Sequence, residues 1–133
     1  MSIKDFAEKY IQVYCEAFRR GNVDELEKLE DSNMVHHSVA RGQDSLVGWE
    51  AHKQAICNMR QAIPDYRPEL RYLTGEGNLF AVSYKARGTL TGQAPGYPPP
   101  TGKEVTLDYL YIFRVNEGRI IEAWYKGTST GLN

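Results

Sequence analysis

The spacing of apolar residues changes at Pro64, and before Pro64 only residues 34–39 depart from helical spacing. Before Pro64 apolar side chains recur every three or four positions, which is typical of helices, and after it they alternate in runs divided by Gly-containing turns. Helices followed by strands bury both amphipathic surfaces when one layer of helices covers one face of an antiparallel sheet. We therefore predict one α+β domain over residues 1–133, with a cavity between the layers if the sheet curls.

Three helices are predicted in the first half of the chain. Their limits rest on residues that cap or stop helices. These residues are Ser2 with Asp5 and then Gly21 for the first helix, Asn22 at the start of the second, and Ser45 and Pro64 at the two ends of the third. Strands are predicted at residues 34–39, 68–74, 79–91, 104–115 and 119–126, and the Pro- and Gly-rich segment 92–102 is predicted to form a pocket rim.

Several classes of function have no support in the composition. The formal net charge is −1 and the pI about 6.3, so there is no electrostatic reason to expect nucleic acid or an anionic membrane as a partner. No apolar run is long enough to cross a bilayer, and the N-terminus lacks the pattern of a signal peptide. We expect a cytoplasmic protein, with Cys15 and Cys57 reduced, no metal site and no nucleotide-binding motif.

The strand around residue 110 is apolar on both faces. Tyr109 and Tyr111 point to one side, and Leu110 and Ile112 to the other, because residues two apart share a face. One side would then cover a pocket or core. The other would pack on a second subunit, so we expect a homodimer.

Glu122 is the candidate acid–base carboxylate of the last strand. If its face looks into a cavity, burial would raise the pKa of Glu122 toward neutrality and allow proton exchange. The alternative is a plain ion pair with Lys126, Arg87 or Arg119.

The three histidines of the chain are further candidates for catalytic or ligand-binding roles. His36 and His37 are adjacent on a strand, so only one can reach the interior, and a shared metal site is not expected. The inner histidine could be a general base, a hydrogen-bond donor to a ligand carbonyl, or a satisfied core residue. His52 is expected on the solvent side of its helix.

Several local phrases, in this order, resemble the SnoaL-like polyketide cyclase family of the nuclear-transport-factor-two-like superfamily, which also contains ketosteroid isomerases. They are AFRRGNVDELEKL, MVHHS, AIPDYRPEL, ARGTLTG, PPPTGKEV and FRVNEGRIIEAW, and they span nearly the whole chain. The resemblance implies a cone-shaped curved antiparallel sheet with three N-terminal helices on its concave face, a hydrophobic pocket, a dimer, and no metal or organic cofactor. Such cyclases close a ring by intramolecular aldol condensation.

The resemblance also assigns site residues. The family's catalytic Asp corresponds to Thr128, which cannot abstract such a proton unaided, whereas the strand histidine is retained at His37. The candidate residues are His37 and Glu122 for catalysis, and Tyr14, Tyr109, Tyr111, Trp124 and Thr128 for substrate contact.

Three functions remain open at this point. The leading one is cofactor-free acid–base catalysis on a small hydrophobic carbonyl compound, of cyclase, isomerase or hydratase type. A non-catalytic small-molecule-binding module is the alternative, because Thr128 stands where the acid should be. A protein–protein adaptor is the third.

Overall fold

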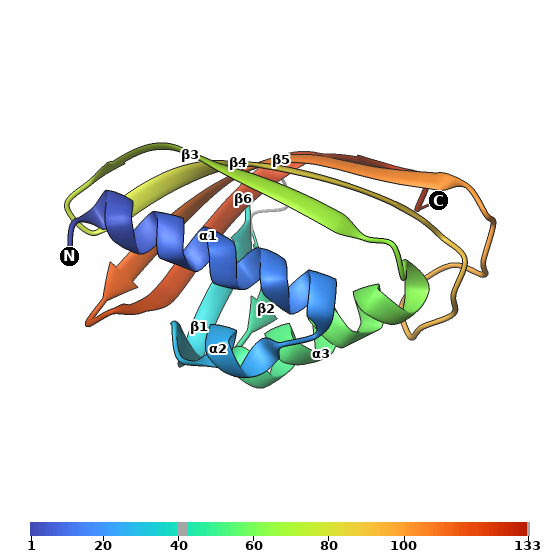
Figure 1. The fold of residues 1–133 in the computed structure, drawn as a ribbon, viewed down its shortest axis with the longest axis horizontal. Coiled ribbons are helices and arrows are strands. Elements are labelled where there is room, and N and C mark those ends of the chain that lie inside the picture. The colour runs from blue at the N-terminus through green and yellow to red at the C-terminus, as the bar shows by residue number, and fades with distance from the viewer. Residues whose placement is uncertain (40–42, 133) are drawn as a thin grey trace.

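The computed structural model describes residues 1–39 and 43–132, which form three helices and one six-stranded curved sheet (Figure 1). The helices are α1 (Ile3–Arg20), α2 (Val23–Glu27) and α3 (Trp49–Ala62). The strands are β1 (Glu30–Ser38), β2 (Gln43–Val47), β3 (Arg67–Glu76), β4 (Leu79–Thr89), β5 (Glu104–Asn116) and β6 (Arg119–Thr130).

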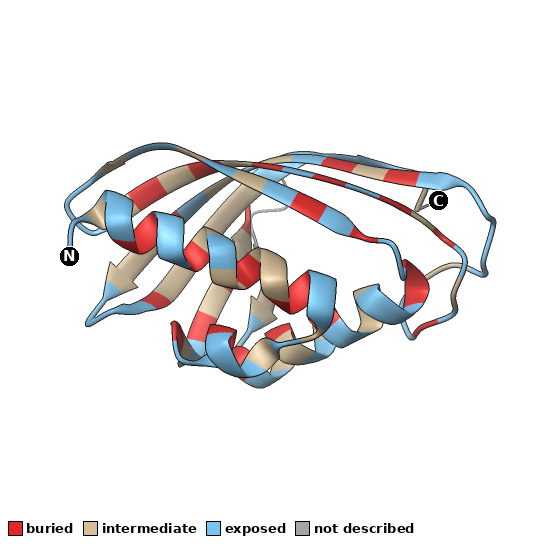
Figure 2. Cartoon of the chain, in the orientation of Figure 1, coloured by how far each residue is buried: buried red, intermediate tan, exposed pale blue. Residues whose placement is uncertain are grey.

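The strands follow the order β2-β1-β6-β5-β4-β3 across the sheet. Strands β3 to β6 form the predicted antiparallel meander, whereas β1 lies parallel to β6. The helices cover the concave side of the sheet, with α1 running along β3 (Figure 1). Figure 2 shows buried positions alternating with exposed ones along α1 and the strands. The predicted α+β class and the helices on the concave face are confirmed.

Helix α1 begins and ends at the residues predicted from the sequence, Ser2 and Gly21. The Asp5 N–H donates to Ser2 Oγ at 3.1 Å, and Gly21 ends the helix with φ of 75° while its N–H donates to the Ala17 carbonyl at 3.0 Å. Asn22 occupies the N-cap position of α2, as predicted, but its side chain makes no capping hydrogen bond.

The segment before α3 differs from the prediction. Residues 43–47 form strand β2, where Val47 pairs with Val35 and Leu46 with His36, and the helix begins at Trp49 rather than at Ser45. Gly48 turns the chain between the two elements with φ of 92°, and its N–H donates to the Met34 carbonyl at 2.6 Å. Pairing with β1 therefore prevails over the local helix-start signal.

An irregularity in β6 decides which of its side chains face the helices. Arg114 pairs with Glu122, but the next residue of β5, Val115, pairs with Ile120, so one extra residue is accommodated in β6. As a result Ile120 and Ala123 are both buried, although strict alternation would place Ile120 on the same face as Glu122. Ala123 pairs with the core residue Phe113, which leaves Glu122 on the convex face.

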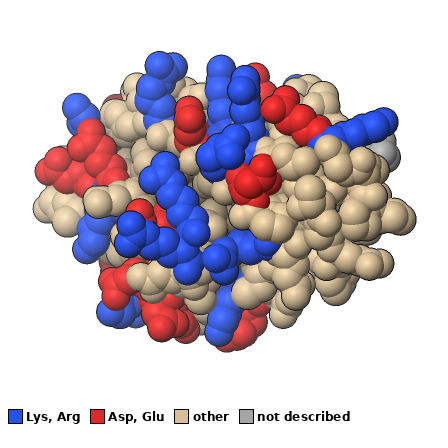
Figure 3. Space-filling view, turned by 45° about the vertical axis from the view of Figure 1, so that its right-hand side comes forward, with Lys and Arg blue, Asp and Glu red and all other residues tan. Residues whose placement is uncertain are grey.

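The surface has a mixed character. On the face shown in Figure 3, basic and acidic side chains are interspersed, and a broad area carries neither. None of the helices in residues 1–39 and 43–132 combines the length and apolarity needed to cross a bilayer.

The convex face of the sheet is the surface through which the predicted homodimer would form. The dimer itself stays a prediction. Leu110 and Ile112 project from β5 on this face and remain 47% and 38% exposed. If two copies pair through this face, the double substitution Leu110→Lys and Ile112→Lys places four unpaired charges in the contact and should dissociate the dimer. Light scattering after gel filtration would show the mass halved, whereas the control Leu73→Lys, at an exposed position of β3, should leave it unchanged. A monomeric wild-type protein would contradict the expectation.

Candidate functional site

A cavity of about 310 Å³ lies between the concave face of the sheet and the helices α1 and α3. Its volume is at the lower end of the range for small-molecule sites. The lining is aromatic and aliphatic apart from two imidazoles. It consists of Tyr14, Phe18, His36, Leu46, His52, Ala55, Ile56, Met59, Tyr84, Leu107, Tyr109, Tyr111, Tyr125 and Leu132.

One wall of the cavity is a stack of tyrosine rings on β5 and β6. The Tyr125 ring lies 5.8 Å from that of Tyr109 and 5.3 Å from that of Tyr111, with interplanar angles of 24° and 19°. Burial raises the pKa of Tyr111 far above its ordinary value, so its phenol keeps its proton. The wall therefore offers flat apolar surface together with a neutral hydroxyl.

A second group of phenols stands beside the cavity. The Tyr14 hydroxyl donates to that of Tyr84 at 3.5 Å, and the hydroxyls of Tyr66 and Tyr84 are hydrogen-bonded to each other. Burial raises the pKa of all three phenols. These groups stay neutral. Each phenol carries one proton, so the two hydrogen bonds among the three hydroxyls leave one proton that can be donated to a ligand oxygen.

A buried polar contact at the cavity joins His52 to Glu30. His52 Nδ1 lies 2.6 Å from Glu30 Oε1, and the Tyr10 hydroxyl donates to Glu30 Oε2 at 2.7 Å. The Glu30 side chain is 0% exposed and that of His52 6%. Because a carboxylate only accepts hydrogen bonds, Nδ1 carries the proton of this contact, and Nε2 is the nitrogen left for a molecule in the cavity.

The position of His52 contradicts the expectation that it faces solvent. Trp49, His52 and Ile56 are spaced three and four residues apart on α3, and all three are buried. This spacing is visible in the sequence and is the signal that could have placed His52 inward. Nothing comparable marks Glu30, which lies at the first position of β1.

His36 is the second imidazole of the cavity. Its ring centroid lies 4.8 Å from that of His52, edge to face, and it is 6% exposed. Burial, assisted by the nearby His52 and His37, lowers the pKa of His36 well below its ordinary value, so the ring is neutral. Its Nδ1 is sealed from solvent and has no hydrogen-bond partner among the described residues.

The structure brings His37 and Glu122 together, but on the convex face. His37 Nε2 lies 3.0 Å from Glu122 Oε2, Arg114 Nε lies 3.2 Å from Glu122 Oε1, and the His37 ring stacks on Trp124 with centroids 5.4 Å apart. Met34 and His36 are buried on the opposite face of β1. Neither His37 nor Glu122 lines the cavity, and the ion pair of Glu122 is with Arg114 rather than with Lys126, Arg87 or Arg119.

The expected substrate contacts divide into two groups. Tyr14, Tyr109 and Tyr111 line the cavity. Trp124 and Thr128 do not, since Thr128 pairs with Asp108 on the side of the sheet opposite to Tyr109 and is exposed. The segment 92–102, predicted as a pocket rim, contributes no lining residue, and the preceding Leu90 is fully buried in the core.

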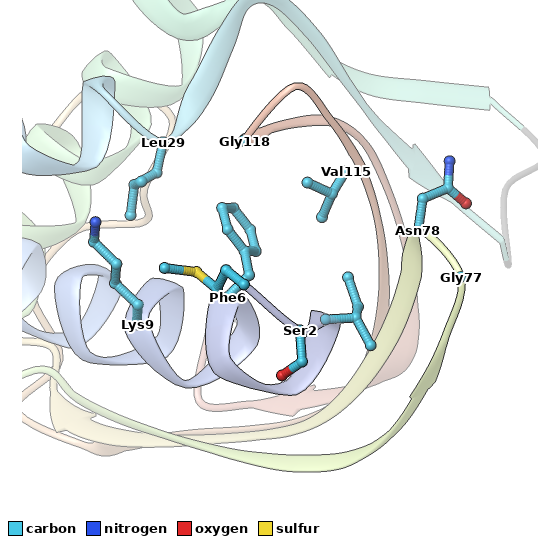
Figure 4. A pocket seen from close by; sticks show the side chains of 10 residues that line it. Ser2, Phe6, Lys9, Leu29, Gly77, Asn78, Val115 and Gly118 are labelled. Atoms are coloured by element: carbon cyan, nitrogen blue, oxygen red, sulfur yellow. The ribbon is translucent and has the colours of Figure 1, made fainter.

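A larger cavity, of about 440 Å³, lies at the N-terminal end of α1, beside the β3–β4 and β5–β6 turns (Figure 4). Lys9 is the only charged side chain of its lining, where Phe6, Leu29 and Val115 supply apolar surface. It offers no pair of groups that could take and return a proton. Within residues 1–39 and 43–132, no group of three or more His, Cys, Asp or Glu side chains is arranged to hold a metal ion.

The contact between Tyr10 and Glu30 should contribute measurably to stability. Tyr10→Phe removes one of two hydrogen bonds to a buried carboxylate, and we expect the free energy of unfolding to fall by roughly 1.5–3 kcal/mol. Tyr14→Phe is the matched control, because its hydroxyl contact is long at 3.5 Å and should contribute less than about 1 kcal/mol. Urea denaturation measures both values, and equal losses would contradict the assignment.

The lowered pKa of His36 predicts a pH dependence. As the pH falls below about 6.5, the unfolded chain protonates this imidazole while the folded chain does not, so the folded state loses stability. Relative to His36→Asn, the wild type should lose about 1.4 kcal/mol per pH unit until the pH reaches the folded pKa. Denaturation curves at several pH values test this, and parallel profiles for the two proteins would contradict it.

Solved structures share this fold along most of the chain. AclR, a proposed hydroxylase from Streptomyces galilaeus, matches with a TM-score of 0.76 and 20% identity over 96% of this chain and 81% of that one. IdmH, a proposed polyketide cyclase from Streptomyces antibioticus, matches with a TM-score of 0.71 and 26% identity over 90% of both chains. TsrD from Streptomyces laurentii matches with a TM-score of 0.78 and 18% identity over 92% and 88%.

Sequence comparison gives the family. No curated protein sequence matches the chain significantly. The sequence profile described as SnoaL-like polyketide cyclase matches residues 8–127, which include all the helices and strands apart from the first turns of α1 and the end of β6. This chain therefore belongs to the SnoaL-like polyketide cyclase family.

Proposed function

We propose that this protein is an acid–base enzyme that acts on a small hydrophobic carbonyl compound, with His52 as the base and Glu30 as the residue that orients it. The observation that carries the proposal is the buried 2.6 Å contact between His52 Nδ1 and Glu30 Oε1, made by an imidazole that also lines the cavity. The carboxylate holds the Nδ1 proton, so Nε2 is the nitrogen that can take a proton from a substrate.

The chemistry that this arrangement supports is proton abstraction beside a carbonyl. His52 Nε2 takes the proton, the C–H electron pair becomes the carbon–carbon double bond of an enolate, and the carbonyl π electrons move to its oxygen. In an isomerisation the proton returns to another carbon. In a cyclisation the enolate carbon attacks a second carbonyl, and His52 returns the proton to the alkoxide.

The rest of the cavity fits such a substrate. The tyrosine wall offers flat apolar surface, and the Tyr84 phenol, when Tyr66 donates to it, is a donor for an oxygen that gains negative charge. Family membership and the likeness to IdmH support a cyclase-type reaction.

A deuterium-exchange assay with simple ketones tests the proposal. Aryl and fused-ring ketones such as 2-tetralone would be incubated with the protein in D₂O, and exchange of the hydrogens beside the carbonyl followed by NMR. We expect His52→Gln to slow the protein-catalysed exchange by about 100- to 10,000-fold. Glu30→Gln should also slow the exchange, because a neutral amide accepts the Nδ1–H hydrogen bond of His52 less strongly than a carboxylate does.

The matched control is His37→Gln, on the convex face, which should leave exchange unchanged. If His37→Gln abolished exchange and His52→Gln did not, the role of base would belong to His37, the residue favoured by the family resemblance.

A binding module on the same fold is the second candidate, and Thr128 at the position of the family's acid favours it. It predicts that ketones bind, as measured by calorimetry, while no exchange exceeds the rate in buffer. Exchange above that rate that is lost in His52→Gln would exclude this candidate.

A further inference from the structure

The two imidazoles of the cavity, His36 and His52, differ in their hydrogen-bond partners. Glu30 fixes the proton of His52 on Nδ1, whereas no carboxylate among the described residues contacts His36. Their rings nevertheless lie edge to face with centroids 4.8 Å apart, and both line the same cavity. A molecule that contacts one ring is therefore within reach of the other.

The tautomer of His36 follows from the burial of its Nδ1. This atom has no exposed surface and no hydrogen-bond partner within residues 1–39 and 43–132. A buried N–H without a partner is rarer in proteins and more costly than a buried lone pair without one. In a neutral ring the single proton therefore belongs on Nε2, and His36 contacts the cavity through that side.

Neutrality of this ring agrees with its surroundings. It pairs with Ala123 of β6 and Leu46 of β2, and the titratable groups near it are His52 of α3 and His37 of β1. Burial and both neighbouring imidazoles disfavour the charged form. A neutral imidazole N–H still polarises a carbonyl, and it does so without protonating the base beside it.

We propose that His36 is the donor that polarises the substrate carbonyl, through Nε2–H, and that it works with His52 as an adjacent pair of opposite tautomers. This inference rests on the proposed function and narrows it: the substrate presents a carbonyl oxygen to His36 and the hydrogen of a neighbouring carbon to His52. The cavity thus selects enolisable carbonyl compounds and, as stable mimics, flat enols such as 2-naphthol. His36 becomes a second catalytic residue.

The first test needs no substrate. Long-range ¹⁵N–¹H NMR spectra of the histidine-labelled protein distinguish an N–H nitrogen from a lone-pair nitrogen in each ring. We expect the neutral form of His52 to carry its proton on Nδ1 and His36 to carry it on Nε2. The proposal is overturned if His36 carries its proton on Nδ1, or if it is charged at neutral pH.

The second test uses a pair of variants that differ in where an amide N–H sits. The amide of His36→Gln reaches the place of Nε2–H, whereas that of His36→Asn reaches only the place of Nδ1. We expect His36→Asn to weaken 2-naphthol binding at least tenfold and to slow ketone exchange by about 100-fold or more, while His36→Gln keeps most of both. The same two substitutions at His37 should change neither.

The readouts separate failure of this inference from failure of the proposed function. The His52 signals in the NMR spectra show whether each variant keeps the Glu30 contact and the fold. Suppose that the wild type catalyses no exchange but binds 2-naphthol, and that His36→Asn weakens this binding whereas His36→Gln does not. The enzyme proposal then fails, and the role of His36 as a hydrogen-bond donor is supported. Equal effects of His36→Asn and His36→Gln, with the His52 signals intact, would overturn the role of His36.

Discussion

The candidate site depends on one buried contact, the hydrogen-bonded pair of Glu30 and His52. A carboxylate without exposed surface is stable only when its oxygens are occupied, and here His52 and Tyr10 each occupy one. The three residues belong to β1, α3 and α1, so the contact joins the sheet to two helices. The interaction that compensates a buried charge also fixes which nitrogen of His52 faces the cavity.

The sheet contributes the tyrosine wall of the cavity, because side chains alternate between the two faces of each strand. The extra residue in β6 lets Ile120, Ala123 and Tyr125 all face inward, and it leaves Glu122 and Trp124 outside. The same alternation on β5 places Tyr109 and Tyr111 against the cavity and Leu110 and Ile112 on the convex face. One strand thereby contributes to the cavity wall and to the exposed apolar surface of the convex face.

Much of this fold can be read from the sequence, because local signals and packing agree. Ser2 limits α1 through its hydroxyl and Gly21 through its tolerance of a positive φ, and the alternation after Pro64 marks the meander. Strand β2 was missed, because its five residues gain their structure by pairing with β1 rather than from their own pattern.

The polar groups of the site were harder to predict. Adjacent histidines on a strand give the same pattern whichever of them faces inward, and the resemblance favoured His37 where the structure has His36 at the cavity. Glu30 looks like any surface carboxylate until its partners on other elements are known. Tyr14, Tyr109 and Tyr111 do line the cavity, whereas their contact with a substrate stays a prediction.

The parallel pairing of β1 with β6 has a consequence for how the protein forms. Glu30 pairs with Ile120, and the Ile120 N–H donates to the Leu29 carbonyl at 2.8 Å. This contact joins residues that are about ninety positions apart in the sequence. Such a contact of high sequence separation costs loop-closure entropy and forms slowly. During synthesis β1 emerges long before β6, so the edge of β1 that pairs with β6 stays open until the β5–β6 hairpin has emerged.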